Sequence, residues 1–202
     1  MAKSYSRRRR IGTIMLAFAC LAVAGGATWS LFGKSTDSLA FARSDPDVTA
    51  SISTKPASIG PSGLAIPRFV SLKAEKVNVR RGPSSDHPVA WVFQRKGLPV
   101  EIVAEFENWR RIRDSDGEEG WILQSMLAGK RTVVVAPWRG QQLTMLHAAA
   151  SKDSPPAANL AAGAMGEVSS CDGKWCNINA SGYDGYVEQD MLWGVYPGET
   201  VN

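Results

Sequence analysis

The feature that most constrains this chain is a closing segment that occurs twice. The ten residues from Gly120, GWILQSMLAG, and the ten from Gly185, GYVEQDMLWG, lie 65 positions apart and are identical at five positions. The identical residues are Gly, Gln, Met, Leu and Gly, and an aromatic residue follows the first Gly in both copies. A repeat of about 65 residues is too long for a solenoid unit and suits a small barrel. We therefore expect two similar domains in tandem.

Short apolar or alternating runs, separated by turn residues, make up the chain from residue 67 onward. Runs of about four to eight residues at this spacing are typical of an all-β barrel or sandwich. The one helical alternative, AANLAAGAM from Ala157, is short and interrupted by glycine. The fold class is therefore all-β, with two small barrels. We expect strands at FVSL, VNV, VAWVF, PVEIVAEF, WRRIR, WI and RTVVV, and in the second copy at QLTMLH, EVSSC, WCNIN and GYVE.

Three elements of the first copy form a familiar pattern: VNVRRGP from Val77, the pair Trp109 and Ile112, and the closing step GWI from Gly120. In these residues the copy resembles the bacterial SH3-like (SH3b) family. The second copy departs from the pattern, because LTMLHAAASKDSPP from Leu143 replaces the Arg-x-Gly-Pro element, while its later half resembles the family again. Tandem pairs of this kind resemble exported SH3-like proteins of Gram-negative bacteria. The resemblance implies SH3-like β-barrels and a non-catalytic binding module of the cell envelope.

The repeat and the composition divide the chain into four parts. Residues 1–42 are an export signal or a membrane anchor. Residues 43–66 are rich in Ser, Thr, Pro, Gly and Ala and hold no aromatic residue, so they predict a disordered linker. Residues 67–131 form the first SH3-like domain, and residues 132–202 form the second, degenerate one.

The first part carries the pattern of an exported protein. Four arginines at residues 7–10 precede 22 uncharged residues, 11–32. A positive segment followed by an apolar one is typical of export, with the arginines left on the cytoplasmic side. Small residues around Ala22 and Ala40 offer cleavage sites, whereas 22 uncharged residues are also long enough to span a bilayer. We expect either a soluble periplasmic protein or one anchored in the inner membrane by residues 11–32.

The positive net charge of the chain, +4, comes from its first part. Residues 1–42 hold six basic residues and one acidic residue, which leaves 17 of the 23 basic and 18 of the 19 acidic residues for the remainder. This balance argues against nucleic acid as a partner. Residues 67–131 hold 12 basic and 9 acidic residues, whereas residues 132–202 hold 3 and 7. The opposite signs either hold the two domains together or direct them to different partners.

The strand WRRIR predicts the ligand-binding residues of the first domain. Alternation places Ile112 on the core face, with Val100, Ile102 and Ile122, and it places Trp109 and Arg111 on the other face. Aromatic grooves on SH3 barrels bind extended peptides. Alternatively, the tryptophans cap the barrel and the arginines form a solvated strand face. The candidate ligand-binding residues are Trp109, Arg111, Trp121 and Arg80.

Two of the three cysteines, Cys171 and Cys176, flank the tetrapeptide DGKW. If DGKW forms the turn of a hairpin, the two cysteines face each other across the strands. In an oxidising compartment such a pair is stable as a disulfide. A redox-active pair is the alternative, but the spacing is not Cys-x-x-Cys, and a metal site lacks the further ligands it needs. We therefore expect a disulfide between Cys171 and Cys176, no metal and no cofactor.

The sequence offers little support for catalysis. The only two histidines, His87 and His147, have no nucleophile at a recognisable spacing, and two domains of about 65 residues leave no room for a separate catalytic domain. We therefore expect a protein that is not an enzyme and that binds peptidoglycan or a protein of the envelope. The alternative is a structural, regulatory or accessory subunit of an envelope complex or a cell-wall hydrolase, without affinity for the wall.

Overall fold

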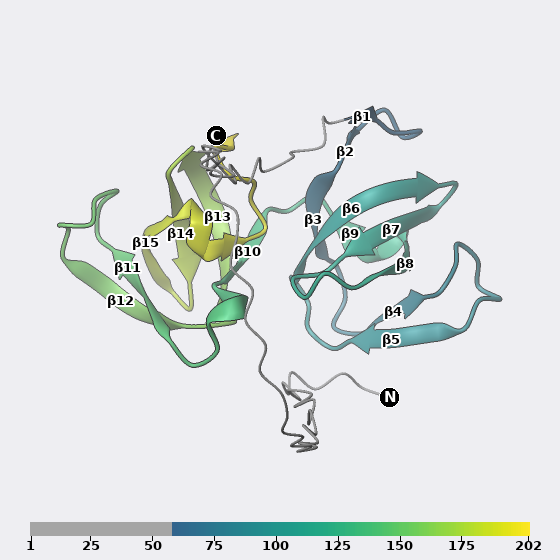
Figure 1. Cartoon of the computed structure of the whole chain (residues 1–202), viewed down its shortest axis with the longest axis horizontal. Coiled ribbons are helices and arrows are strands. Elements are labelled where there is room, and N and C mark those ends of the chain that lie inside the picture. Colours follow the sequence, from purple (N-terminus) through teal and green to yellow (C-terminus); the bar gives the residue numbers. More distant parts are fainter. Residues whose placement is uncertain (1–57) are drawn as a thin grey trace, which may run out of the picture. The chain divides into compact units, whose positions relative to one another are not determined.

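The computed structural model describes residues 58–202, which are built from β-strands (Figure 1). The predicted export segment and residues 43–57 of the predicted linker lie outside this range. The described part contains strands β1 to β17 and three short 3-10 helices, and it contains no α-helix. No helix within it has the length and apolar character needed to cross a membrane. The predicted all-β fold class is confirmed.

The first barrel is an antiparallel sheet of seven strands in the order β5-β4-β8-β7-β6-β3-β9. Its buried core contains all four predicted core residues, Val100, Ile102, Ile112 and Ile122, each 2% exposed or less. The elements are β3 (Arg68–Leu72), β4 (Val77–Arg80), β5 (Val89–Phe93), β6 (Pro99–Phe106), β7 (Trp109–Arg113), β8 (Glu119–Leu123), the 3-10 helix η1 (Gln124–Met126) and β9 (Leu127–Ala128).

The second barrel repeats this order as β12-β11-β15-β14-β13-β10-β16, and β17 adds to β13. The segment with the helical alternative forms strand β12, because it pairs with β11 over five positions. Tertiary pairing here outweighs the low strand preference of alanine. The elements are β10 (Thr132–Val135), η2 (Pro137–Arg139), β11 (Leu143–His147), β12 (Pro156–Ala161), β13 (Met165–Asp172), β14 (Trp175–Ala180), β15 (Tyr183–Glu188), η3 (Gln189–Met191), β16 (Leu192–Trp193) and β17 (Thr200–Val201).

The first glycine of the repeated ending lies where two strands approach closely. A Cβ atom at Gly120 would lie 2.4 Å from Cγ1 of Val79, and one at Gly185 would lie 2.6 Å from the carbonyl oxygen of His147. These distances are far below van der Waals contact, so any side chain would push the strands apart. The repeated glycine is therefore a packing requirement of both barrels.

The repeated glutamine ties the closing turn to the preceding hairpin. The backbone N–H of Gln124 donates to the carbonyl oxygen of Asn108, and that of Gln189 donates to the carbonyl oxygen of Lys174, both at 2.8 Å. Each bond joins a 3-10 helix to the turn of the β6–β7 or β13–β14 hairpin. The Met and Leu that follow lead into β9 and β16, which pair with β3 and β10. The predicted short turn before the last strand of each barrel is confirmed.

One cross-strand position is stabilised by different chemistry in the two barrels. In the first barrel Glu105 of β6 faces Arg110 of β7, and their charged groups lie 3.2 Å apart. In the second barrel Cys171 of β13 faces Cys176 of β14, and the two form a disulfide with a Cα–Cα distance of 4.1 Å. The predicted Cys171–Cys176 disulfide is confirmed, and it takes the position of an ion pair.

Reduction of this disulfide is expected to lower the free energy of unfolding of the second barrel by about 2 kcal/mol, because the bridge closes a short loop. Urea denaturation with and without a thiol reductant measures the change. The double variant C171S/C176S is the control, since its stability should not respond to the reductant. Equal stability of the oxidised and reduced wild-type chains would contradict the prediction.

The structure corrects the end of the predicted linker 43–66. Strands β1 (Ser58–Ile59) and β2 (Ala65–Ile66) form a hairpin in its last part. The backbone N–H and the hydroxyl group of Ser62 both donate to the carboxylate of Glu105, at 2.9 and 2.8 Å. Composition alone did not indicate this order, because the partner that holds the hairpin lies 43 residues along the chain.

The two barrels belong to one compact unit and contact each other. The ring of Phe69 in β3 lies 5.1 Å from that of Trp193 and 4.7 Å from that of Tyr196, between centroids. The indole N–H of Trp193 donates to the carbonyl oxygen of Pro99 at 3.2 Å, and the hydroxyl group of Tyr196 donates to Glu101 at 3.0 Å. Aromatic packing and hydrogen bonds thus join the barrels. Two ion pairs of opposite sign also link the predicted domains, Lys130 with Glu167 and Arg131 with Glu199.

Candidate functional site

Three of the four predicted ligand-binding residues lie in one row across strands β4, β8 and β7. Arg80 is opposite Trp121 in the β4–β8 pairing, and Trp121 is opposite Arg111 in the β7–β8 pairing. The fourth, Trp109, comes two residues before Arg111 on β7, so its side chain leaves the same face of the strand. The structure brings all four side chains to one outer face of the first barrel, and their role as ligand contacts stays a prediction.

An apolar row borders this one. Trp109 is opposite Leu123 on β8 and Phe106 on β6, which are 37% and 50% exposed. Neither Trp109 nor Trp121 is among the side chains that form or pack against the buried core of this barrel. We call the two rows the basic aromatic face. It consists of Arg80, Phe106, Trp109, Arg111, Trp121 and Leu123.

Ion pairs with two glutamates hold the arginines beside this face in place. Arg111 lies 2.9 Å from the carboxylate of Glu119, and Arg113 lies 2.9 Å from the same carboxylate. Arg113 also contacts Glu101 at 3.2 Å. Within residues 58–202 Arg80 pairs with no carboxylate, and it donates to the carbonyl oxygen of His87. Three guanidinium groups are therefore accompanied by only two carboxylates, and the face keeps an excess of positive charge.

The loop after β4 keeps its geometry in the second barrel although its sequence is lost. The loop between β4 and β5 and the loop between β11 and β12 are both eight residues long. In the first, Nη1 of Arg80 donates to the carbonyl oxygen of His87 at 2.7 Å. In the second, Nδ1 of His147 lies 3.3 Å from the carbonyl oxygen of Ser154. His147 therefore stands in the place of Arg80 and braces its loop in the same way.

The outer face of the second barrel retains aromatic side chains but not the arginines. Strand pairing identifies the equivalent residues, since Gly185 and Gly120 occupy the same register position. Both tryptophans are replaced by aromatic residues, whereas both arginines, the apolar leucine and Phe106 change, the last to Asp172. The replacements are Trp175 for Trp109, Tyr186 for Trp121, His147 for Arg80, Asn177 for Arg111 and Glu188 for Leu123.

A cleft of about 430 Å³ opens beside Trp175 on the second barrel. It lies between the β11–β12 loop, the β13–β14 turn and η3. We call it the second-barrel cleft, and its charged and aromatic lining residues are Lys152, Lys174, Trp175, Glu188 and Asp190. No sequence argument assigned a site here. A sequence signal that could have indicated it is Trp175, which precedes the repeated ending by nearly the same distance as Trp109 does.

Hydrogen bonds fix the turn that forms one wall of this cleft. The carboxylate of Asp172 accepts the backbone N–H groups of Trp175 at 2.7 Å and Lys174 at 2.8 Å. These bonds lower the pKa of Asp172. On the opposite wall Nζ of Lys152 lies 2.8 Å from the carboxylate of Glu188, and this hydrogen bond raises the pKa of Lys152.

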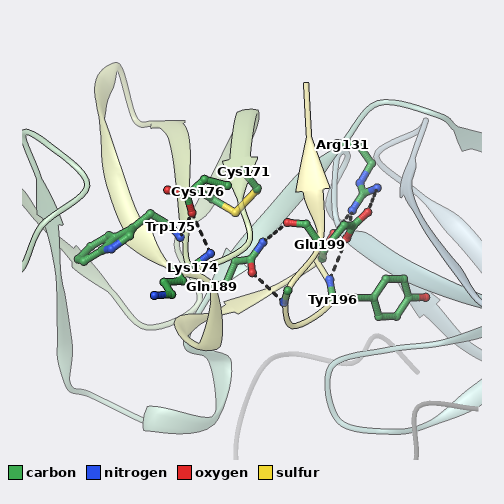
Figure 2. Close-up of a disulfide and its surroundings, with 11 residues drawn as sticks. Arg131, Cys171, Lys174, Trp175, Cys176, Gln189, Tyr196 and Glu199 are labelled. Carbon is green, nitrogen blue, oxygen red and sulfur yellow. Dashed lines mark hydrogen bonds and ion pairs between the residues drawn. A yellow bond between two sulfur atoms is a disulfide. The ribbon is translucent and has the colours of Figure 1, made fainter.

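A partly buried network borders the cleft (Figure 2). The side-chain amide of Gln189 donates to the carbonyl oxygen of Glu199 at 2.6 Å and accepts the N–H of Gly198 at 3.0 Å. Burial would raise the pKa of Glu199, but its bonds with Arg131 and with the N–H of Tyr196 lower it. Figure 2 shows the indole ring of Trp175 pointing away from this network.

The histidines form contacts of a structural kind. The hydroxyl group of Ser84 lies 3.0 Å from Nδ1 of His87 and also accepts the N–H of Asp86, as in an ordinary loop. The ring of His147 packs edge-on against Trp175, with 5.2 Å between centroids. Within residues 58–202 no group of three His, Cys, Asp or Glu side chains is placed to hold a metal ion.

Comparison with known proteins supplies one family match. A family model described as bacterial SH3 domain matches residues 73–129 and 141–194, one segment in each barrel. No curated protein matches the chain. Similar solved structures include NlpC2 from Trichomonas vaginalis, with 17% identity over 63% of this chain and 48% of that chain, at a TM-score of 0.29. NlpC1 from the same organism has 18% identity over 62% and 45%, at a TM-score of 0.28. The chain spans less than half the length of either.

Proposed function

Since the chain belongs to the bacterial SH3 domain family, with one copy of the domain in each barrel, we propose that it is a non-catalytic module that binds cell-wall peptidoglycan. The observation that supports this proposal is the basic aromatic face of the first barrel. It places Trp109 and Trp121 beside Arg80 and Arg111 on neighbouring strands.

The chemistry of this face suits a polymer of sugars and short peptides. Indole rings offer large rigid contact areas at a small entropic cost. Guanidinium groups bind carboxylates with two parallel hydrogen bonds, and the free carboxylates of a wall peptide are such partners. The Arg111 side chain is 49% exposed and its pair with Glu119 is therefore weak, so its guanidinium group is available to a ligand.

The proposal places the folded barrels outside the cytoplasm, where the wall is. Residues 1–42 would then serve as a cleaved signal or as an inner-membrane anchor. Cell fractionation followed by N-terminal analysis of the exported chain distinguishes these two forms.

Replacement of Trp109 by alanine is expected to reduce retention of the chain from residue 43 onward on purified cell-wall sacculi by at least about tenfold, the usual effect of losing an aromatic anchor. Retention at moderate salt is the measurement. The matched control is Trp138→Ala, because Trp138 is an exposed tryptophan of the second barrel that lies outside the basic aromatic face. If the wild-type chain is not retained on sacculi, the proposal is wrong. If Trp109→Ala and Trp138→Ala lose retention equally, the basic aromatic face is not the binding surface.

A protein partner is the second candidate, and a different observation favours it. Trp138, Leu143 and Met145 are exposed on the second barrel, and the last two alternate outward along β11. Exposed apolar side chains that gather in this way favour protein contacts. If the partner is a protein, we expect that the chain does not bind sacculi. We also expect that Leu143→Asp abolishes crosslinking of the chain to its partner in intact cells, whereas Trp109→Ala does not.

A further inference from the structure

The second-barrel cleft differs from the basic aromatic face in the balance of its charges. Lys152 at the tip of the β11–β12 loop and Lys174 in the β13–β14 turn supply two ammonium groups. Glu188 at the end of β15 and Asp190 in η3 supply two carboxylates. The net charge of these four side chains is zero. Trp175 adds an aromatic surface to the same cleft.

These charged groups are available to a ligand. Lys152 and Glu188 pair with each other, but the lysine side chain is 74% exposed, and such exposed pairs are weak. The ammonium group of Lys174 and the carboxylate of Asp190 have no hydrogen-bond or ion-pair partner within residues 58–202. Both signs of charge can therefore bind a new group without the loss of a strong existing contact.

The backbone that carries these side chains is held rigidly. The Cys171–Cys176 disulfide closes the hairpin whose turn contains Lys174. Asp172 fixes the turn through two backbone N–H groups, and Gln189 joins the turn to η3. A site on a pre-formed scaffold loses little entropy when it binds. Its volume of about 430 Å³ suits a ligand the size of a dipeptide.

We propose that the second-barrel cleft binds a zwitterionic ligand, a short peptide or amino acid with a free ammonium group and a free carboxylate. The ligand carboxylate pairs with Lys174, its ammonium group pairs with Glu188 and Asp190, and its apolar part rests on Trp175. A ligand of a single charge sign would pair with only two of the four charged groups and would be repelled by the other two.

This site is separate from the basic aromatic face and does not depend on wall binding there. The strand face next to the cleft has His147 and Asn177 where the first barrel has Arg80 and Arg111. The two barrels therefore select different ligand chemistry. The opposite charge excesses of residues 67–131 and 132–202 agree with this division.

Three forms of one dipeptide test the proposal on the full chain. The probes are alanyl-alanine with free termini, its N-acetyl form and its C-terminal amide, followed by saturation-transfer NMR titration. Each blocked form is expected to bind at least about tenfold more weakly than the free dipeptide, because each loses one charge-assisted interaction. Equal affinity of the three forms overturns the proposal, and so does a loss that follows amidation alone. Absence of binding by the free dipeptide at about 10 mM overturns it as well.

Variants locate the binding in the cleft. Lys174→Ala and Asp190→Asn change exposed side chains, so the fold should survive, and each is expected to weaken binding of the free dipeptide at least about fivefold. Trp109→Ala is the matched control and should leave dipeptide binding unchanged. Because that variant impairs only the first barrel, failure of wall binding and failure of this inference are measured separately. Unchanged affinity in both cleft variants overturns the assignment.

Discussion

Replacement of Gly194 by alanine is expected to lower the free energy of unfolding of the second barrel by at least about 3 kcal/mol. This loss is a large fraction of the total stability of a small domain. The φ angle of Gly194 is +125°, which side-chain-bearing residues rarely adopt. A Cβ atom there would lie 2.3 Å from the carbonyl oxygen of Thr132, which is backbone and cannot rotate away. The backbone strain at this φ angle and the steric overlap with Thr132 therefore both lower the stability of the variant.

The matched control is the equivalent glycine of the first copy. A Cβ atom at Gly129 meets nothing within 4 Å, and its φ angle is not in the left-handed region. Gly129→Ala should therefore change stability by no more than about 0.5 kcal/mol. Urea denaturation followed by circular dichroism gives both values, and hydrogen exchange assigns the loss to one barrel. Similar stability of the two variants would show that the backbone at Gly194 tolerates a side chain.

Glu105→Gln is expected to destabilise the first barrel by about 2 kcal/mol at neutral pH, with no difference from the wild type near pH 2. The Glu105 side chain is 1% exposed and lies 2.6 Å from Arg68 and 3.2 Å from Arg110. Burial alone would raise its pKa, but bonds from Arg68 and Ser62 and the charge of Arg110 lower the pKa from 4.5 to about 2. A shift of this size corresponds to about 3 kcal/mol. The amide oxygen of glutamine still accepts some of these hydrogen bonds, so the expected loss is about 2 kcal/mol.

The pH dependence follows from the direction of this shift. A carboxylate whose pKa is lower in the folded state stabilises the fold above pH 4.5, and the contribution is lost as the pH falls from 4.5 towards about 2. The free energy of unfolding of both proteins, measured at several pH values over this range, should converge at the acid end. Glu107→Gln is the control, since Glu107 lies exposed in the neighbouring turn. A constant difference across the whole range would contradict the ionic role of Glu105.

Most of the fold was predictable, because it rests on local patterns. Alternation in WRRIR correctly placed Ile112 in the core, where it is fully buried. The repeated Gly, Gln and Leu correctly marked the closing turns, since each has a short-range partner in its own barrel. Cys171 and Cys176 were pairable because the turn between them fixes which strand positions face each other.

The remaining features depend on partners that lie far apart in the sequence. Glu105 binds Ser62 and Arg68, 43 and 37 residues away, so the hairpin at residues 58–66 looked like linker. The contact between Phe69 and Trp193 was also not predictable, because the two residues lie in different barrels and far apart in the sequence. The second-barrel cleft combines a loop, a turn and a 3-10 helix, and no single segment carries its charge balance. Four of the six residues of the basic aromatic face were predicted from the sequence, whereas Phe106, Leu123 and the order of the residues across the strands were not.

The exchange of an ion pair for a disulfide at one cross-strand position gives the two halves of the chain different sensitivities to their surroundings. Acid weakens the half that contains Glu105 and Arg110, and a reducing environment weakens the half that contains Cys171 and Cys176. The first barrel can therefore reach its full free energy of unfolding in any compartment of neutral pH. The second barrel gains its full stability only in a compartment where thiols are oxidised. The redox state of Cys171 and Cys176 therefore reports whether the chain has reached such a compartment.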